Sequence, residues 1–249
     1  MIRKSPLLAL AALGTLAFAG VAQAGPITYQ ISANNLTAAE NAESAFLSSL
    51  QAGYTTEDFE NVAGVTDNTQ YLSITTPVGK FESVVQGTGG ACDNLGYDCK
   101  NGLAILNGDP GTNPFSGRFN TTPNPGGNKW LDSFDAQDFL FTVATGNNAV
   151  GFFITDPNDA GGRFDFFTTD GNAHTLFVDD IFGKSLGNKG VFYVSFISEL
   201  DIESIRIVTN NSDDGFGVDG VTVGRVPEPG TLALLGLGLL GAGLMRRRA

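Results

Sequence analysis

The residues of this 249-residue chain best suited to chemistry are carboxylates in turns rich in Asn, Asp and Gly. Calcium takes about six to eight oxygen ligands from carboxylates, carbonyls and water, and such turns supply them. Glu60 and Asp219 lie on the first and last clear strands of the body, so they become neighbours if those strands pair. Asp156 and Asp159 share one tight turn after an apolar strand. Both pairs predict a structural calcium site; the alternative is that these acids cap their own turns.

Patterns typical of catalysis are weaker. The segment GKSLG (residues 183–187) fits the G-x-S-x-G pattern of a hydrolase. That pattern needs a later histidine and a following helix, whereas the single histidine, His174, precedes the segment and a strand-like stretch follows it. The single histidine, together with two cysteines that are themselves expected to form a disulfide, also excludes an ordinary zinc site. The chain has enough carboxylates for the acid–base pair of a carbohydrate-active enzyme. The separation of the two carboxylates decides that chemistry, and the sequence does not give this separation, so the alternative stays open.

Aromatic residues offer a second kind of site, since the apolar faces of sugars stack on aromatic rings. Trp130 follows a loop rich in Gly, Asn and Pro, so it is the candidate for a ligand-stacking residue at a rim, although core packing is the role that we expect first. Tyr71, Tyr97 and Tyr193 are weaker candidates. Most of the 19 phenylalanines fall at alternate strand positions and predict core.

The elements that must position these residues are mostly strands. Thr37 and Glu40 form a capping-box pattern before a predicted helix at residues 38–51, and Gly53 is suited to end it. About eleven short strands follow, separated by Gly, Asn, Asp and Pro. They are predicted at residues 56–62, 70–75, 80–85, 102–106, 138–144, 149–155, 163–168, 174–178, 191–197, 204–209 and 218–223. The sequence therefore predicts an all-β fold, an antiparallel β-sandwich of jelly-roll, lectin-like type with one N-terminal helix. Residues 107–128 are predicted to form a surface loop or lid.

The N-terminal residues 1–24 predict a signal peptide. Arg3 and Lys4 precede an apolar run at residues 7–21, and Ala22 and Ala24 place small residues where a signal peptidase reads them. Cleavage after Ala24 leaves a body at residues 25–225. This body enters a compartment that permits disulfides, so a bridge between Cys92 and Cys99 is predicted to pin a loop.

The C-terminal residues 226–249 predict a sorting signal with a short membrane anchor. Pro227, Glu228 and Pro229 end the folded body, because each proline forces the preceding residue into an extended conformation. Residues 231–245 are uncharged. As a helix they would rise about 22 Å against a hydrocarbon core of roughly 30 Å, which favours a transient anchor over a permanent span. The stop-transfer cluster Arg246, Arg247 and Arg248 should stay cytoplasmic, which leaves the body outside.

This tail resembles the PEP-CTERM sorting signal of Gram-negative bacteria. The resemblance implies processing by a membrane-embedded exosortase, export across the inner membrane to the cell surface or beyond, and association with exopolysaccharide. TTEDFEN (55–61), GRFNT (117–121), NKWL (128–131), AVGFFITDPNDAGG (149–162) and DGFGVDGVTVG (214–224) also resemble a recurrent extracellular domain of PEP-CTERM proteins. That second resemblance implies a lectin-like sandwich and adds no chemistry.

Charge narrows the range of partners. Residues 25–225 carry 9 basic and 25 acidic residues, a formal charge of −16. Such a surface repels phosphate backbones and therefore argues against nucleic-acid binding, whereas it suits cations and neutral sugars. We expect a non-catalytic exported surface or biofilm-matrix protein that associates with extracellular polysaccharide. The alternatives are a secreted carbohydrate-active enzyme using paired carboxylates and a structural envelope protein without a specific ligand.

The predicted disulfide gives a first test. Peptide mapping of the exported, unreduced protein should recover Cys92 and Cys99 in one linked peptide. Closing so short a loop stabilises by roughly 2–3 kcal/mol, so Cys99→Ser should lower the free energy of unfolding by no more than that and keep the fold. Alkylation of both thiols in the unreduced native protein would contradict the bridge.

Overall fold

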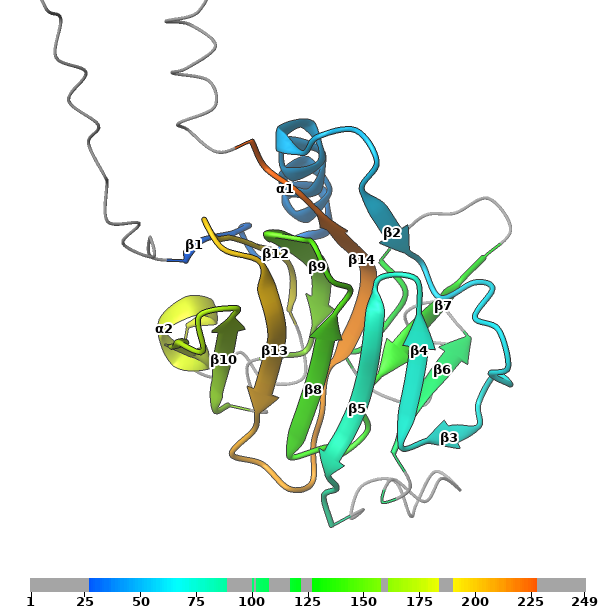
Figure 1. Cartoon of the computed structure of the whole chain (residues 1–249). Coiled ribbons are helices and arrows are strands. Elements are labelled where there is room, and N and C mark those ends of the chain that lie inside the picture. Colours follow the sequence, from blue (N-terminus) through cyan, green and yellow to red (C-terminus); the bar gives the residue numbers. More distant parts are fainter. Residues whose placement is uncertain are drawn as a thin grey trace, which may run out of the picture.

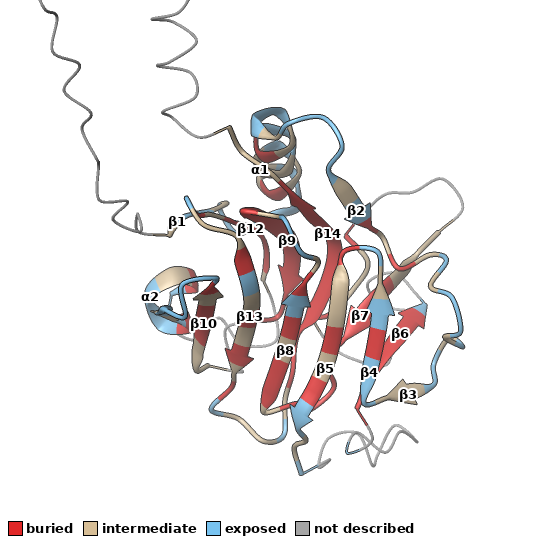
Figure 2. Cartoon of the chain, viewed as in Figure 1, coloured by how far each residue is buried: buried red, intermediate tan, exposed pale blue. Residues whose placement is uncertain are grey.

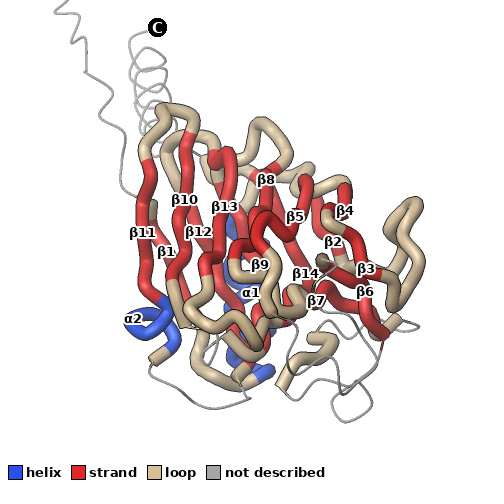
Figure 3. The backbone as a smooth tube through the Cα atoms, turned by 90° about the horizontal axis from the view of Figure 1, so that it is seen from below, coloured by secondary structure: helices blue, strands red, loops and turns tan. Residues whose placement is uncertain are grey.

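The computed structural model describes residues 27–88, 100, 102–107, 117–121, 127–157, 161–183 and 190–227. Two antiparallel sheets pack face to face, as Figures 1 and 3 show from two directions. The expected antiparallel β architecture with one main helix is confirmed. The predictions for Ala22, Ala24, Tyr97, the cysteine pair and residues 228–249 concern residues outside the described set.

The larger sheet has eight strands in the order β1-β12-β9-β14-β7-β6-β3, with β2 paired to β14. Its strands are β1 (Thr28–Ile31), β2 (Thr55–Glu57), β3 (Gln70–Tyr71), β6 (Leu103–Asn107), β7 (Lys129–Asp132), β9 (Ala149–Thr155), β12 (Val191–Ile197) and β14 (Gly217–Gly224). The first predicted strand therefore does pair with the last one, because β2 lies beside β14 with Glu57 opposite Val221.

The smaller sheet has six strands in the order β11-β10-β13-β8-β5-β4. Its strands are β4 (Ser73–Thr76), β5 (Gly79–Val85), β8 (Asp138–Val143), β10 (Arg163–Thr168), β11 (Ala173–Phe177) and β13 (Ile202–Val208). One face of this sheet packs on the larger sheet. The other face is left uncovered by the two described helices, and Figure 2 shows exposed and intermediate positions along it.

The core lies between the sheets and is built largely from phenylalanine. Inward positions alternate along the regular stretches of the strands, as the period of two in a strand requires. Phe196 of β12 is fully buried, and its ring centroid lies 4.1 Å from that of Phe166 of β10 on the opposite sheet. Phe81 and Phe141, on neighbouring strands of the smaller sheet, stack at 4.5 Å. The expectation that the phenylalanines are mainly core residues is confirmed at these positions.

Helix α1 (Leu36–Ser49) packs on the outer face of the larger sheet, where Phe46 meets Tyr193 of β12 at a centroid distance of 6.0 Å. Its N-cap is Asn35, whose Oδ1 accepts a hydrogen bond from Ala38 N at 2.8 Å. The predicted capping box at Thr37 was therefore wrong by two residues, because Asn35 already caps the free N–H group of Ala38, the third residue of the helix. The helix ends with Leu50 as an extended C-cap, and Gly53 takes a positive φ in the turn that follows.

Three elements were not expected from the sequence: β1, β7 and the short helix α2 (Val178–Phe182). The single strand predicted at residues 70–75 is also wrong, because the chain there forms two strands, β3 in the larger sheet and β4 in the smaller one. One predicted strand is shorter than expected. Strand β2 stops at Glu57 because the Glu57 carboxylate accepts a hydrogen bond from Phe59 N at 2.9 Å, and Phe59 has a φ of 58°. The chain turns there, so residues 58–62 do not continue the strand.

The aromatic core gives a stability test. Phe196→Ala should lower the free energy of unfolding by about 3–5 kcal/mol, because the truncation leaves a cavity among closely packed rings. Phe177→Ala is the matched control: that ring is 57% exposed, so its loss should change stability by no more than about 0.5 kcal/mol. Denaturant unfolding measures both. Similar losses for the two variants would contradict the core assignment.

Candidate functional site

Glu60 and Asp219, the first predicted calcium pair, have different hydrogen-bond partners. Glu60 Oε1 accepts a hydrogen bond from Lys129 N at 2.8 Å. Asp219 Oδ2 accepts from Thr121 N at 2.8 Å and from Thr121 Oγ1 at 3.1 Å, while Asp219 Oδ1 accepts from Gly220 N at 2.7 Å. These contacts attach separate connecting segments to the larger sheet. The strands pair as expected, and each of the two carboxylates accepts hydrogen bonds from a different connecting segment or strand.

The second predicted calcium pair, Asp156 and Asp159, is only half described, because Asp159 lies outside the described residues. Asp156 is buried and takes a φ of 60° directly after β9. In the described part of the chain, no three His, Cys, Asp or Glu side chains are grouped so that they could hold a metal ion. Calcium binding that involves Asp159 therefore stays a prediction.

Trp130 is a core residue, as the favoured of its two interpretations predicts, and not a sugar-stacking residue at a rim. Its side chain is fully buried in a small apolar cluster with Ala104, Leu106 and Phe134 on the outer side of the larger sheet. Gly217 of β14 lies against the indole ring, because a Cβ added at Gly217 would come within 2.9 Å of it. Trp130 therefore packs in the core, and its ring has no exposed face to offer a sugar.

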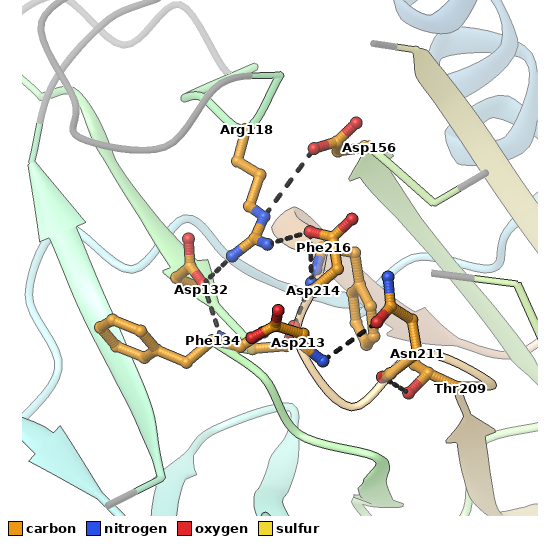
Figure 4. Close-up of polar contacts among 11 residues, drawn as sticks. Arg118, Asp132, Phe134, Asp156, Thr209, Asn211, Asp213, Asp214 and Phe216 are labelled. Atoms are coloured by element: carbon orange, nitrogen blue, oxygen red, sulfur yellow. Dashed lines mark hydrogen bonds and ion pairs between the residues drawn. The ribbon is translucent and has the colours of Figure 1, made fainter. Parts of the chain in front are cut away.

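A buried arginine gathers three of the acids instead (Figure 4). Arg118 Nη1 donates to Asp132 Oδ1 at 3.0 Å, and Nη2 donates to Asp214 Oδ1 at 2.6 Å. Asp156 Oδ2 lies 3.9 Å from Arg118 Nε, close enough for an ion pair but too far for a hydrogen bond. The side chains of Arg118, Asp132 and Asp156 are at most 5% exposed, and that of Asp214 is 20% exposed. We call these four residues the arginine cluster.

The arginine cluster joins four separate parts of the chain. Asp132 ends β7, Asp156 follows β9, Asp214 precedes β14, and Arg118 belongs to the connection between β6 and β7. Asp132 Oδ1 also accepts from Phe134 N at 2.6 Å, which fixes the turn after β7. One guanidinium therefore holds three loops at one end of the larger sheet.

The stability of the arginine cluster depends on the positive charge of the Arg118 guanidinium. Burial raises the pKa of Asp132, because a carboxylate loses more hydration than a neutral carboxyl; Arg118 acts against this shift. Among the described residues, no hydrogen-bond partner reaches the buried Asp132 Oδ2. Three carboxylates share one guanidinium, so the role of the arginine cluster is to hold these loops in position. Sequence reasoning missed it, since Arg118 and Asp214 lie 96 residues apart.

A surface groove lies on the uncovered face of the smaller sheet, at the end where β8 stops and β13 begins. Its volume is about 410 Å³. Leu140 and Thr142 of β8 and Ser204 of β13 form part of its lining. The remaining polar residues of the lining come from the same two strands and the neighbouring turns: Thr145, Thr169, Asp201 and Glu203. We call this feature the β8–β13 groove.

The β8–β13 groove offers hydroxyl and carboxylate oxygens beside apolar surface. Thr142, Thr145, Thr169 and Glu203 are exposed, and Leu140 and Ser204 are half-buried. Phe167 of β10 is directly opposite Ser204 in the sheet, and its half-buried ring extends the apolar surface next to the groove. Oxygens that accept or donate hydrogen bonds, placed beside apolar side chains, are what a polyhydroxylated ligand needs.

Comparison with known families identifies the tail. Residues 225–248 match the PEP-CTERM protein-sorting motif. The chain therefore carries the signal of an exosortase-sorted, exported protein with a transient membrane anchor. Among the helices of the described residues, none is long and apolar enough to cross a membrane. A comparison of the chain with curated proteins finds no match.

The arginine cluster gives a test with a pH signature. Arg118→Met should lower the free energy of unfolding at pH 7 by about 3–5 kcal/mol, because it leaves buried carboxylates without their cation. Burial already raises the pKa of Asp132, and loss of Arg118 removes the positive charge that opposes this shift. The penalty is therefore absent below the unfolded pKa and appears as pH rises through the raised folded pKa, so the loss should shrink toward pH 4.

Arg163→Met is the matched control. Arg163 Nε also pairs with a carboxylate, Asp165 Oδ2 at 2.9 Å, but the arginine side chain is 43% exposed. Its loss should cost no more than about 1 kcal/mol. Denaturant unfolding of both variants at several pH values measures the difference. A cost for Arg118→Met that is small, or that does not change with pH, would contradict the buried-charge account.

Proposed function

We propose that this exosortase-sorted protein is a non-catalytic surface or extracellular-matrix protein that binds neutral polysaccharide in the β8–β13 groove. The observation that carries the proposal is a groove of about 410 Å³ lined by hydroxyls and carboxylates on an otherwise uncovered sheet face. In this proposal the two sheets act as a lectin-like sandwich of jelly-roll type, and the sorting signal delivers the protein to the place where such polymers accumulate.

The chemistry of the groove supports a sugar rather than an apolar ligand. Threonine and serine hydroxyls both donate and accept hydrogen bonds, so Thr142, Thr145 and Ser204 can match sugar hydroxyls of either polarity. The carboxylate of Glu203 accepts from sugar hydroxyls, and charge-assisted bonds of this kind are the stronger ones. Leu140 supplies an apolar contact for the C–H face of a ring.

The charge of the body supports a neutral polymer rather than an acidic one. The formal charge of −16 on residues 25–225 repels polyanions, and both charged groups of the groove lining, Asp201 and Glu203, are acidic. Binding should therefore be strongest for neutral glycans and depend little on salt. A polyanion such as heparin should not bind.

The test compares two threonines that differ in position rather than type. Thr142 on β8 and Thr75 on β4 are both exposed and are both paired with Lys80, on either side of β5. Thr75 therefore lies two strands from Thr142, about 10 Å away, and outside the groove lining. Neutral oligosaccharides selected on a glycan array are titrated by calorimetry into the wild type, Thr142→Trp and Thr75→Trp.

Thr142→Trp should weaken binding at least tenfold, because the indole fills the groove, whereas Thr75→Trp should stay within twofold of the wild type. Equal affinities for the two variants would place the site elsewhere. New reducing ends are also assayed after the same oligosaccharides are incubated with the wild type. Their steady formation would favour the carbohydrate-active enzyme instead. No binding of any neutral glycan would favour the structural envelope protein.

A further inference from the structure

The uncovered face of the smaller sheet carries its outward side chains in rows. Strands β8, β13, β10 and β11 lie side by side, as Figure 3 shows from below. Phe164 and Phe166 of β10 are fully buried in the core, so the alternate residues Arg163, Asp165 and Phe167 point outward. Directly paired residues of an antiparallel sheet share one face. From β8 to β11, three outward rows are therefore Thr142–Ser204–Phe167–Ala173, Leu140–Arg206–Asp165–Thr175 and Asp138–Val208–Arg163–Phe177.

The first row begins in the β8–β13 groove, and the third row ends at an exposed aromatic ring. Phe177 is 57% exposed, more than any other aromatic residue that the structure describes. It ends β11 in an extended conformation, and the buried residues of the helix that follows are Val178 and Phe182. The ring of Phe177 therefore stays on the outward face and adds little to the core. Such a ring offers the apolar face on which a sugar stacks.

The charges between the groove and Phe177 compensate one another. Arg206 Nε donates to Asp138 Oδ1 at 2.6 Å, and Arg163 Nε donates to Asp165 Oδ2 at 2.9 Å. Thr175 Oγ1 also donates to Asp165, at 2.6 Å. Two positive and two negative charges sum to zero here, although residues 25–225 carry −16. A neutral ligand can lie over these pairs without burying an uncompensated charge.

The same arginines supply hydrogen-bond donors to a ligand. The side chains of Arg206 and Arg163 are 41% and 43% exposed. A guanidinium has five N–H donors, and the ion pairs occupy only some of them. Sugar hydroxyls can accept from the others. The strip from the groove to Phe177 thus combines donors, compensated charge and an aromatic ring.

The distance along this strip sets the length of ligand that could use both ends. Ser204 of the groove lies two strands from Phe177 across the sheet, which is about 10 Å. It also lies four residues from Val208, the residue of β13 in the same row as Phe177, which adds about 14 Å along the strand. The straight line between the two sites is therefore about 17 Å. A single sugar in the groove does not reach Phe177, whereas a chain of several sugars does.

We propose that a neutral linear polysaccharide runs from the β8–β13 groove across β13 and β10 to β11, and that Phe177 is a second subsite on which one of its rings stacks. This inference rests on the proposed function, because the groove makes the first contact. Once the groove holds the chain, contact with Phe177 is intramolecular and raises the overall affinity. The protein should therefore prefer long chains to short ones of the same sugar.

A polysaccharide is favoured over a second copy of this chain as the occupant of the strip. The strip is neutral and continues directly from the groove, as a neutral polymer requires. A second copy would bring another body with a formal charge of −16, and the two bodies would repel each other.

The experiment separates the second subsite from the groove by chain length. The disaccharide and the octasaccharide of three neutral linear series, the cello-, laminari- and manno-oligosaccharides, are titrated by calorimetry into the exported wild type, Phe177→Ala and Phe177→Trp. Tyr54→Ala is the matched control. Tyr54 is 42% exposed and lies against Gly224 of the larger sheet, away from the uncovered face.

The wild type should bind the octasaccharide of at least one series at least twentyfold more tightly than its disaccharide. Phe177→Ala should weaken octasaccharide binding at least fivefold and keep disaccharide binding within twofold, because only the longer chain reaches the ring. Phe177→Trp, which keeps an aromatic face, and Tyr54→Ala should both stay within twofold of the wild type for either length.

Three results would overturn the second subsite. Equal octasaccharide affinity of Phe177→Ala and the wild type would do so while leaving the groove intact. A wild-type dimer in sedimentation that becomes a monomer in Phe177→Ala would show that the ring binds a second copy instead. Absence of binding at either length in the wild type would contradict the proposed function together with this inference.

Discussion

Strand β14 is the element on which the rest of the structure depends. One edge pairs with β9 from Gly217 to Gly224, and the other edge pairs with β7 over its first half and with β2 over its second half. Gly220 takes a φ of 53° within the irregular stretch between Asp219 and Thr222, where the register with β9 shifts. The last strand of the body therefore lies inside the larger sheet rather than at its edge, so the chain must be complete through Gly224 before this sheet can close.

Both polar features of the molecule follow from that central strand. At its first end, Asp214 joins the arginine cluster, which fastens the connection carrying Arg118 to the loops after β7 and β9. At its last end, Arg225 Nη1 donates to Asp201 Oδ1 in the lining of the β8–β13 groove, and Val226 N donates to Asn148 Oδ1. The two ends serve different purposes, because the first is buried and its charges are used internally. The second is at the surface, where the side chains of Arg225 and Asp201 are 40% and 32% exposed.

Much of the fold could be predicted because a half-buried strand has a local period of two. Strands β9, β10 and β12, which are rich in Phe, Val and Ile, have the predicted bounds of residues 149–155, 163–168 and 191–197. The prediction failed where local pattern is weak. Strand β1 is a short TYQI segment with mostly exposed residues, and β7 follows a stretch rich in Gly, Asn and Pro that resembles a loop. In both cases, pairing with strands distant in the sequence stabilises a strand that the local sequence does not predict.

The sequence alone determined the sorting signal, the strand content and the acidic character of the body, because each is a property of consecutive residues or of composition. Only the tertiary structure decided what the acids and the tryptophan do. Asp219 binds Thr121 and Asp214 binds Arg118, contacts that span 98 and 96 residues. Trp130 is buried because Leu106 lies opposite it on β6 and Gly217 of β14 lies against its ring. Such partners depend on the order of strands in a sheet. That order is set by how both sheets pack around the whole core and not by any local pattern.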